Sequence, residues 1–181
     1  MIMNKKDEHF VNKSNTEGAS KDTWQTPIPL FIALDQEFNF ELDACASIDN
    51  ALCINWFTEG VSSLTNEWSS KDCDIRSAFM NPPYSQTELF LNRAADQANK
   101  HNITVVALVN ANTDTKWFAN AVKSANEIRL IRGRIGFVGE AGKKVNGNTK
   151  GQCLIIWRGN CKTPCNIVMV NRDELIGGNN G

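Results

Sequence analysis

The stretch Ala78-Phe79-Met80-Asn81-Pro82-Pro83-Tyr84 decides the fold of this chain. Its three apolar residues predict a short buried strand. The two prolines end that strand, because proline has no N–H to donate to a neighbouring strand and its φ angle is fixed. The residue before each proline is pushed toward extended geometry. We therefore expect a stiff turn in which backbone carbonyls, the Asn81 side chain and the Tyr84 ring face outward.

Such a turn suits a planar group that carries an NH2. Oxygen acceptors can meet its two N–H bonds, and an aromatic ring can stack on its plane. An ordinary proline turn that caps the following helix would have the same residues, but the position between an apolar strand and a helix favours a binding site. The candidate catalytic residues are therefore Asn81, Pro82, Pro83 and Tyr84.

Strands and helices alternate on both sides of this stretch. Thr26-Pro27 predicts a helix start, with Thr26 as the N-cap, and residues 40–43 predict a strand that ends in an acid. Ser85 and Glu88 have the spacing of a capping box, which predicts a helix to about residue 100. The other predicted elements are strands at 103–109, 127–132, 134–138 and 153–158, and a helix at 115–124.

This order predicts an α/β fold with a mostly parallel, twisted, Rossmann-like sheet flanked by helices. The last predicted strands are close together in the chain, which favours an antiparallel hairpin at one edge of the sheet. We expect a single domain at residues 21–175, with flexible tails at 1–20 and 176–181.

The composition indicates a globular protein of the cytoplasm. Of the 181 residues, 41% are hydrophobic, which is enough to build a core. No apolar run approaches the ~20 residues of a membrane-spanning helix, and the N-terminus lacks the apolar segment of a signal peptide. The six cysteines form no Cys-x-x-Cys pair, so we expect free thiols and no metal site.

The net charge of -1 hides an uneven distribution. Residues 1–113 carry 8 Lys/Arg and 15 Asp/Glu, whereas residues 114–162 carry 10 Lys/Arg and 3 Asp/Glu. This balance argues against an indiscriminate nucleic-acid binder, and the basic half can be a solvated face. Beside the Asn-Pro-Pro-Tyr stretch, a surface that faces phosphates is favoured. Members of the basic half include Lys143, Lys144, Lys150 and Arg158.

Asn81-Pro82-Pro83-Tyr84 resembles motif IV, [DNS]-P-P-[YFW], of the amino-methyltransferases that use S-adenosylmethionine. Other stretches resemble, in the same order, the blocks of the phage and prophage DNA adenine methyltransferases of the Dam type. The chain is similar to this family over about residues 22–158. The resembling stretches are Trp24-Gln25-Thr26-Pro27 and residues 40–47, 50–53, 56–58, 112–118 and 132–137.

The resemblance implies a class I methyltransferase that transfers a methyl group from S-adenosylmethionine to the exocyclic amine of an adenine in DNA, in a site-specific manner. The base must be flipped out of the duplex. Hydrogen bonds from its amine to the Asn81 side chain and the Pro82 carbonyl would favour a pyramidal nitrogen. No strong general base is needed, because the methylated nitrogen becomes very acidic once it carries positive charge. Residues 40–47 stand where most such enzymes carry G-x-G-x-x-G, a motif that this chain lacks.

The resemblance also implies roles for further residues. Tyr84 would stack on the flipped base, and Phe137 would close its other face, although Phe137 can equally be a core residue. DNA is the expected partner, and a homodimer is a further possibility. The expected cofactor-binding residues are Thr26, Pro27, Asp43, Ala44, Cys45, Ser47 and Asn81, and the expected phosphate-binding residues are Arg132, Arg134, Lys143 and Lys144.

Two alternatives remain open at this point. An RNA or protein N-methyltransferase can use the same motif, since the amide of glutamine is planar as well. Glutamine-amide methyltransferases usually have a glycine-rich motif and a helical N-terminal domain, and the chain shows neither. A non-catalytic nucleic-acid-binding or anti-restriction protein could keep this fold, but it would not need an intact Asn-Pro-Pro-Tyr. We expect no separate target-recognition domain.

Overall fold

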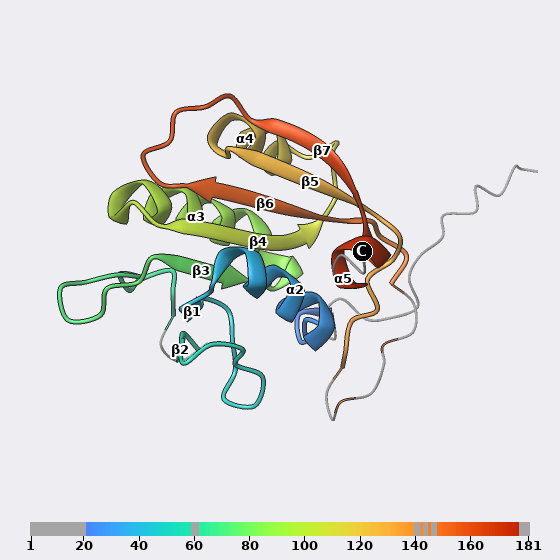
Figure 1. The fold of residues 1–181 in the computed structure, drawn as a ribbon, viewed down its shortest axis with the longest axis horizontal. Helices are drawn as coiled ribbons and strands as arrows, with labels where there is room; N and C mark the ends of the chain where they lie inside the picture. Colours follow the sequence, from blue (N-terminus) through green and yellow to red (C-terminus); the bar gives the residue numbers. More distant parts are fainter. Residues whose placement is uncertain (1–20, 59–61, 140–141, 143–144, 146–147, 178–181) are drawn as a thin grey trace, which may run out of the picture.

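The computed structural model describes residues 21–58, 62–139, 142, 145 and 148–177. Seven strands among them form one sheet in the order β2-β1-β3-β4-β6-β5-β7 (Figure 1). The strands are β1 (Leu42–Asp43), β2 (Asn55–Trp56), β3 (Ser77–Met80), β4 (Thr104–Asn110), β5 (Glu127–Arg132), β6 (Gln152–Arg158) and β7 (Asn166–Asn171). The helices are α2 (Ile28–Phe38), the 3-10 helix η1 (Tyr84–Gln86), α3 (Thr87–His101), α4 (Lys116–Ser124) and α5 (Arg172–Gly177).

The sheet is mostly parallel, as the sequence predicts. Only β6 runs against its neighbours, and it lies inside the sheet between β4 and β5. The sheet therefore contains antiparallel pairs as expected, but the prediction that they form a hairpin at an edge is wrong. The edge beyond β5 is formed by β7, which pairs parallel to β5 and which the sequence analysis did not predict.

Residues 134–138 do not form the predicted strand. Gly133 turns the chain away at the end of β5 with a φ of +101°, a conformation that favours glycine. Val138 alone pairs antiparallel, with Gln25. The segment crosses the end of the sheet instead of joining it.

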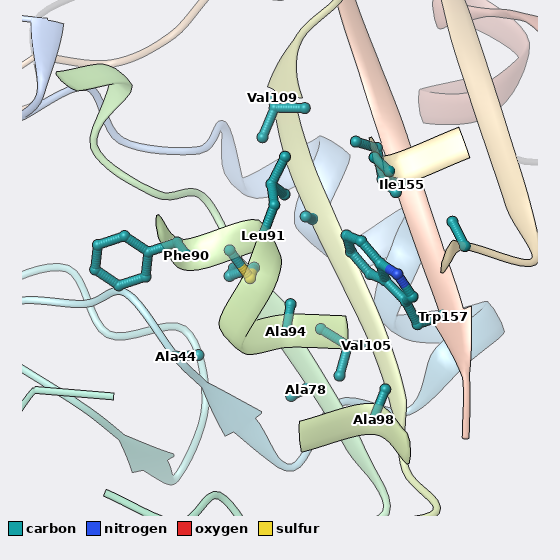
Figure 2. Close-up of a cluster of buried hydrophobic side chains, with 14 of the residues drawn as sticks. Ala44, Ala78, Phe90, Leu91, Ala94, Ala98, Val105, Val109, Ile155 and Trp157 are labelled. Carbon is teal, nitrogen blue, oxygen red and sulfur yellow. The ribbon is translucent and has the colours of Figure 1, made fainter. Parts of the chain in front are cut away.

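The sheet separates two apolar layers. Along β4, side chains alternate between them, because successive residues of a strand point to opposite faces. Val105 and Val109 pack with α3 and α4, as Figure 2 shows for part of this layer, whereas Val106 and Leu108 pack with α2. Both faces of the central strands are thus covered, which explains the uninterrupted apolar run in β4.

The helix starts differ from those predicted. The N-cap of α2 is Pro27, and Thr26 is buried without capping the helix. The hydroxyl of Ser85 donates to the Asp22 carboxylate at 2.6 Å, so Ser85 is not part of a capping box. α4 does begin as expected, with Thr115 accepting the Phe118 N–H at 3.3 Å. The predicted tail from residue 176 overlaps the end of α5.

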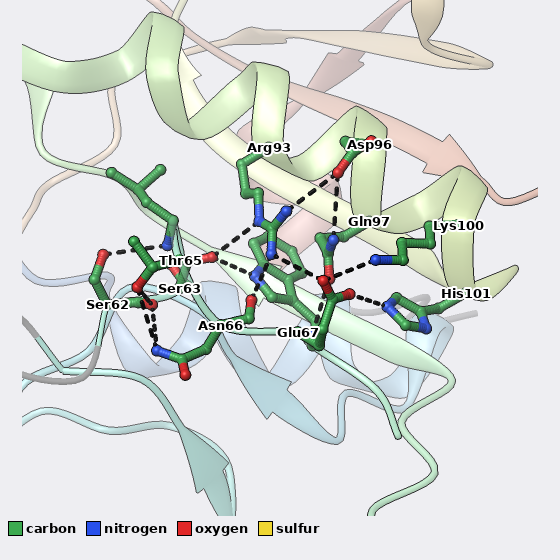
Figure 3. A network of polar contacts seen from close by, with 12 residues as sticks. Ser62, Ser63, Thr65, Asn66, Glu67, Arg93, Asp96, Gln97, Lys100 and His101 are labelled. Atoms are coloured by element: carbon green, nitrogen blue, oxygen red, sulfur yellow. Dashed lines mark hydrogen bonds and ion pairs between the residues drawn. The ribbon is translucent and has the colours of Figure 1, made fainter. Parts of the chain in front are cut away.

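A polar network holds residues 62–68 against α3 (Figure 3). Lys100 and His101 bind the Glu67 carboxylate at 2.8 and 2.6 Å, and they lower its pKa to about 2. Ion pairs at the surface contribute little to the stability of the fold. The buried contact is more important: Gln97 accepts the Trp68 N–H at 2.8 Å, which fixes the path of the chain into β3. Among the described helices, none is long and apolar enough to cross a membrane.

Candidate functional site

The Asn-Pro-Pro-Tyr stretch leaves β3 at its carboxyl end. β3 lies between β1 and β4, and all three strands are parallel, so their carboxyl ends share one edge of the sheet. Asp43 ends β1, Asn81 follows β3 and Asn110 ends β4. Ligands of open α/β sheets bind at this edge. The sheet therefore brings the predicted catalytic stretch beside the acid of the predicted cofactor site.

Two hydrogen-bond acceptors in this stretch have no donor among the described residues. The Asn81 amide donates through Nδ2 to the Trp24 carbonyl at 3.0 Å, and no described residue donates to its Oδ1. The Pro83 carbonyl accepts the Gln86 N–H at 3.0 Å, whereas the Pro82 carbonyl takes no hydrogen bond from the described residues. Asn81 Oδ1 and the Pro82 carbonyl are thus available to accept the two hydrogens of a planar amine.

Tyr84 contributes an aromatic ring to the site, and its phenol is not ionised. Its ring meets Trp24 and Phe137 edge to face, with centroid distances of 5.9 and 6.4 Å. The hydroxyl is buried, with no hydrogen-bond partner among the described residues. Burial, with a smaller contribution from Asp22, raises the pKa of this phenol above its ordinary value, so Tyr84 stays neutral.

Phe137 is a core residue. Its side chain is fully buried, and its ring lies 5.6 Å from that of Trp24 at an angle of 31°. It therefore presents no face that could close on a bound base, because it fills the apolar layer under Trp24 and Tyr84. The role that the resemblance implied for Phe137 is not supported by this position.

Trp24 is the residue of this site that the sequence analysis did not single out. Its backbone binds Asn81, and its buried ring contacts both Tyr84 and Phe137. The only hint was its place in the Trp24-Gln25-Thr26-Pro27 stretch. Trp24 joins the Asn-Pro-Pro-Tyr turn to the segment after β5.

The segment 22–25 is fixed on both sides of Trp24. Asp22 accepts the N–H and the hydroxyl of Ser85, at 3.1 and 2.6 Å. Gln25 and Val138 exchange two backbone hydrogen bonds, of 2.7 and 3.1 Å. The segment is thus a strap across the carboxyl edge of the sheet, with the turn on one side and residue 138 on the other.

Asp43 organises the loop that follows β1. Its carboxylate is 3% exposed and accepts the N–H groups of Cys45 and Leu52, at 3.1 and 3.2 Å. Burial raises its pKa to about 6, against the opposing effect of these two bonds. Ala44 is buried, with its N–H bound to the Phe79 carbonyl at 2.8 Å. The loop is thus held closely on the end of β3.

The other expected cofactor residues lie in different surroundings. Ser47 is exposed, and its N–H is bound by the Asn50 side chain at 2.6 Å. Thr26 is buried and Pro27 half-buried, at the end of the strap. The carboxyl edge therefore brings Asp43, Ala44 and Asn81 into one region by direct strand pairing, and Ser47 belongs to the outer part of the loop.

Asp43 should make the stability of the protein depend on pH. Its pKa of about 6 lies above the ordinary 3.8, so between these values the folded state binds more protons than the unfolded chain. The free energy of unfolding then falls as the pH rises through this window, by about 3 kcal/mol in total. Urea unfolding from pH 4 to 7 should show this fall as the difference between the wild type and Asp43→Asn, which does not titrate. A difference that stays constant with pH would contradict it.

The arginines of the basic half are of two kinds. Arg129 binds Glu37 through two bonds of 2.6 Å and also binds Glu127, which in turn binds Arg158 at 3.0 Å. These side chains neutralise one another near the amino edge of the sheet. Arg129 and Arg158 are therefore not free to bind phosphates, contrary to what the charge count suggested for Arg158.

Three other basic residues of this half lie at the carboxyl edge. Arg132 ends β5, Arg134 follows it, and Lys150 precedes β6, which runs in the opposite direction. All three are exposed and have no ion pair among the described residues. Lys143 and Lys144 lie outside the described residues. The positive charge of Arg132, Arg134 and Lys150 is thus on the same edge as Asn81 and Tyr84.

Comparisons with known proteins agree with this arrangement. Residues 13–180 match the family model described as DNA N-6-adenine-methyltransferase (Dam). A protein of Haemophilus phage HP1 (strain HP1c1) with the name DNA N-6-adenine-methyltransferase is 40% identical over 152 residues, a match that covers 82% of this chain and 85% of the phage protein. A protein of Escherichia phage T1 with the same name is 32% identical over 162 residues, which are 80% of this chain and 66% of that protein.

Proposed function

Because the chain belongs to the Dam family of DNA N-6-adenine-methyltransferases, we propose that it methylates the exocyclic amine of adenine in DNA, with S-adenosylmethionine as the methyl donor. One observation carries the assignment of the site. Asn81 Oδ1 and the Pro82 carbonyl, on successive residues shortly before Tyr84 in the chain, take no hydrogen bond from the described residues.

The residues at the end of β1 fit S-adenosylmethionine. A carboxylate can accept about four hydrogen bonds, and Asp43 uses two of them in its own loop. The remaining sites and the negative charge suit a ligand with hydroxyl groups and positive charge, and the small side chains of Ala44 and Cys45 allow close approach. The residues that would hold the donor are Thr26, Pro27, Asp43, Ala44, Cys45, Ser47 and Asn81.

When bound, the donor supplies a methyl group that its sulfonium has already activated. The chain's part is to orient the acceptor amine. Asn81 Oδ1 and the Pro82 carbonyl accept its two hydrogens, which favours a pyramidal nitrogen with its lone pair free to form the new N–C bond. The nitrogen becomes acidic with its fourth bond and gives one proton to the solvent. No side-chain base is required.

The adenine must leave the duplex to reach Asn81. Flipping costs a few kcal/mol, and stacking on an aromatic ring returns roughly 1–3 kcal/mol. Tyr84 is the ring that we assign to this role, because its phenol stays neutral beside the two acceptors. With Phe137 buried, the other face of the base is left to another group.

The test is a side-by-side assay of methyl transfer from labelled S-adenosylmethionine to DNA, RNA and protein. We expect the labelled methyl group to appear on N6 of adenine in DNA. Transfer to glutamine amides or to RNA alone would support the alternative N-methyltransferases, and saturable DNA binding without any transfer would support a non-catalytic protein. That the protein forms a homodimer stays a prediction. Sedimentation equilibrium would test it.

We expect Arg132, Arg134 and Lys150 to bind DNA phosphates. Changing all three to glutamine should weaken binding to every sequence alike and reduce the slope of log K against log salt by ~0.9 for each phosphate that the variant no longer binds. Affinity for S-adenosylmethionine should not change. Fluorescence anisotropy with a labelled duplex at several salt concentrations measures the slope.

The matched control removes three exposed lysines at the opposite edge, Lys71, Lys123 and Lys162. It changes the net charge by the same amount, so it should leave the slope unaltered if binding is local to the carboxyl edge. Equal slopes for both triple variants would mean that the effect belongs to the overall charge and not to this edge.

A further inference from the structure

The Asn81 amide is held in one of its two orientations. Nδ2 donates to the backbone carbonyl of Trp24, a residue 57 positions earlier in the chain, at 3.0 Å. Turning the amide over would place Oδ1 against that carbonyl, oxygen against oxygen, which is unfavourable. The bond to Trp24 therefore keeps Oδ1 turned away from that carbonyl, as an acceptor to which no described residue donates.

The Trp24 carbonyl is itself fixed. The Trp24 side chain is 8% exposed and contacts the rings of Tyr84 and Phe137. The chain is bound on both sides of Trp24, at Gln25 by the backbone of Val138 and at Asp22 by Ser85. A carbonyl held in this way can orient a neighbouring side chain without cost at the moment of reaction.

We propose that the Trp24 backbone carbonyl is a positioning group for catalysis, which makes this chain depend on an amide, and not a carboxylate, at residue 81. The proposal rests on the proposed role of Asn81 as an acceptor for the adenine amine. Motif IV of the wider group allows Asp in this position, but here an ionised carboxylate would meet the Trp24 carbonyl with no hydrogen to donate.

Asn81→Asp is the decisive variant. At pH 7.5 its rate of methyl transfer should fall on the order of 10²-fold, because the acceptor at the reacting centre is no longer held in place. The rate should recover, relative to the wild type at the same pH, as the pH is lowered to 5.5. A protonated carboxyl has an O–H for the Trp24 carbonyl and a C=O for the amine, so it can replace the amide.

The introduced carboxyl should titrate in an accessible range. Its ionised form would face a carbonyl in a half-buried place, which raises the pKa of a carboxyl above its usual 3.9 or so. The ionisable groups on the elements around Asn81 are Asp22 in the strap, Asp43 at the end of β1 and Tyr84 in η1. Asp22 adds negative charge, which raises that pKa further, Asp43 does so only above its own pKa of about 6, and Tyr84 is neutral.

Asn99→Asp is the matched control. Asn99 lies exposed on α3, where its Nδ2 donates to the Ala95 carbonyl at 2.9 Å, so the same exchange is made against a backbone carbonyl away from the site. Its rate relative to the wild type should not change with pH. Cooperative thermal unfolding of each variant confirms that it is folded.

The outcomes separate the two proposals. Acid recovery in Asn81→Asp alone supports the positioning role of Trp24. A rate near that of the wild type at pH 7.5, a rate that stays low at pH 5.5, or the same recovery in Asn99→Asp would overturn it. Undiminished activity in Asn81→Ala would instead overturn the assignment of Asn81 to the reaction.

Discussion

Asn81→Ala should lower the rate of methyl transfer by about 10²–10³-fold and leave the affinity for S-adenosylmethionine largely intact. The substitution removes Oδ1, one of the two unused acceptors, and it also frees the Trp24 carbonyl from its partner. Methyl transfer needs the amine to be oriented, whereas Asp43, Thr26 and Pro27 would still hold the donor. The effect should therefore fall on the chemical step.

A single-turnover assay with saturating DNA and donor measures this step, and titration calorimetry measures donor binding. Asn99→Ala, which removes an exposed amide on α3, serves as the control and should behave as the wild type. An Asn81→Ala rate within about threefold of the wild type would show that the amide is not part of the site.

Tyr84→Ala should weaken binding of the flipped base by roughly 1–3 kcal/mol, whereas Tyr84→Phe should keep it. The Tyr84 hydroxyl is buried without a hydrogen-bond partner among the described residues, and an unsatisfied buried polar group costs about 1–3 kcal/mol. Tyr84→Phe removes this cost and keeps the ring, so it should be at least as stable as the wild type. Tyr84→Trp should also keep much of the binding.

Affinity for a duplex with an abasic site opposite the target adenine, compared with the intact duplex, reports the contribution of flipping. Thermal unfolding of Tyr84→Phe and the wild type measures the effect of the buried hydroxyl on stability. If Tyr84→Phe were as impaired as Tyr84→Ala, the hydroxyl would have a role in the reaction, and stacking would not be the function of Tyr84.

The sequence predicts the elements that local patterns specify. β5 has the predicted bounds, β3 begins one residue earlier than predicted, and β4 is shifted by one residue at both ends. β7 was missed because its edge position and exposed Ile167 and Met169 give no buried pattern. Residues 134–138 have the composition of a strand, but the left-handed turn at Gly133 removes them from the sheet.

The sequence predicts only those parts of the site in which the type of side chain determines the role. Asn81 and Tyr84 stand out as residue types in an unusual stretch. The bond to Trp24 joins residues 57 positions apart through a backbone carbonyl, which any residue type could supply. Charge counts likewise cannot tell Arg132, which is free of ion pairs among the described residues, from Arg129, which is held by Glu37 and Glu127.

The position of β6 has a consequence for folding. The centre of the sheet is completed by a strand that is synthesised after both of its neighbours, and its residues 152–157 are all buried. Until β6 leaves the ribosome, β4 has an open edge with five consecutive buried apolar residues, and β5 has no partner. Such an edge attracts other chains. The nascent protein is therefore most prone to aggregate just before β6 is made, and a chain that ends before residue 152 has two halves that cannot join.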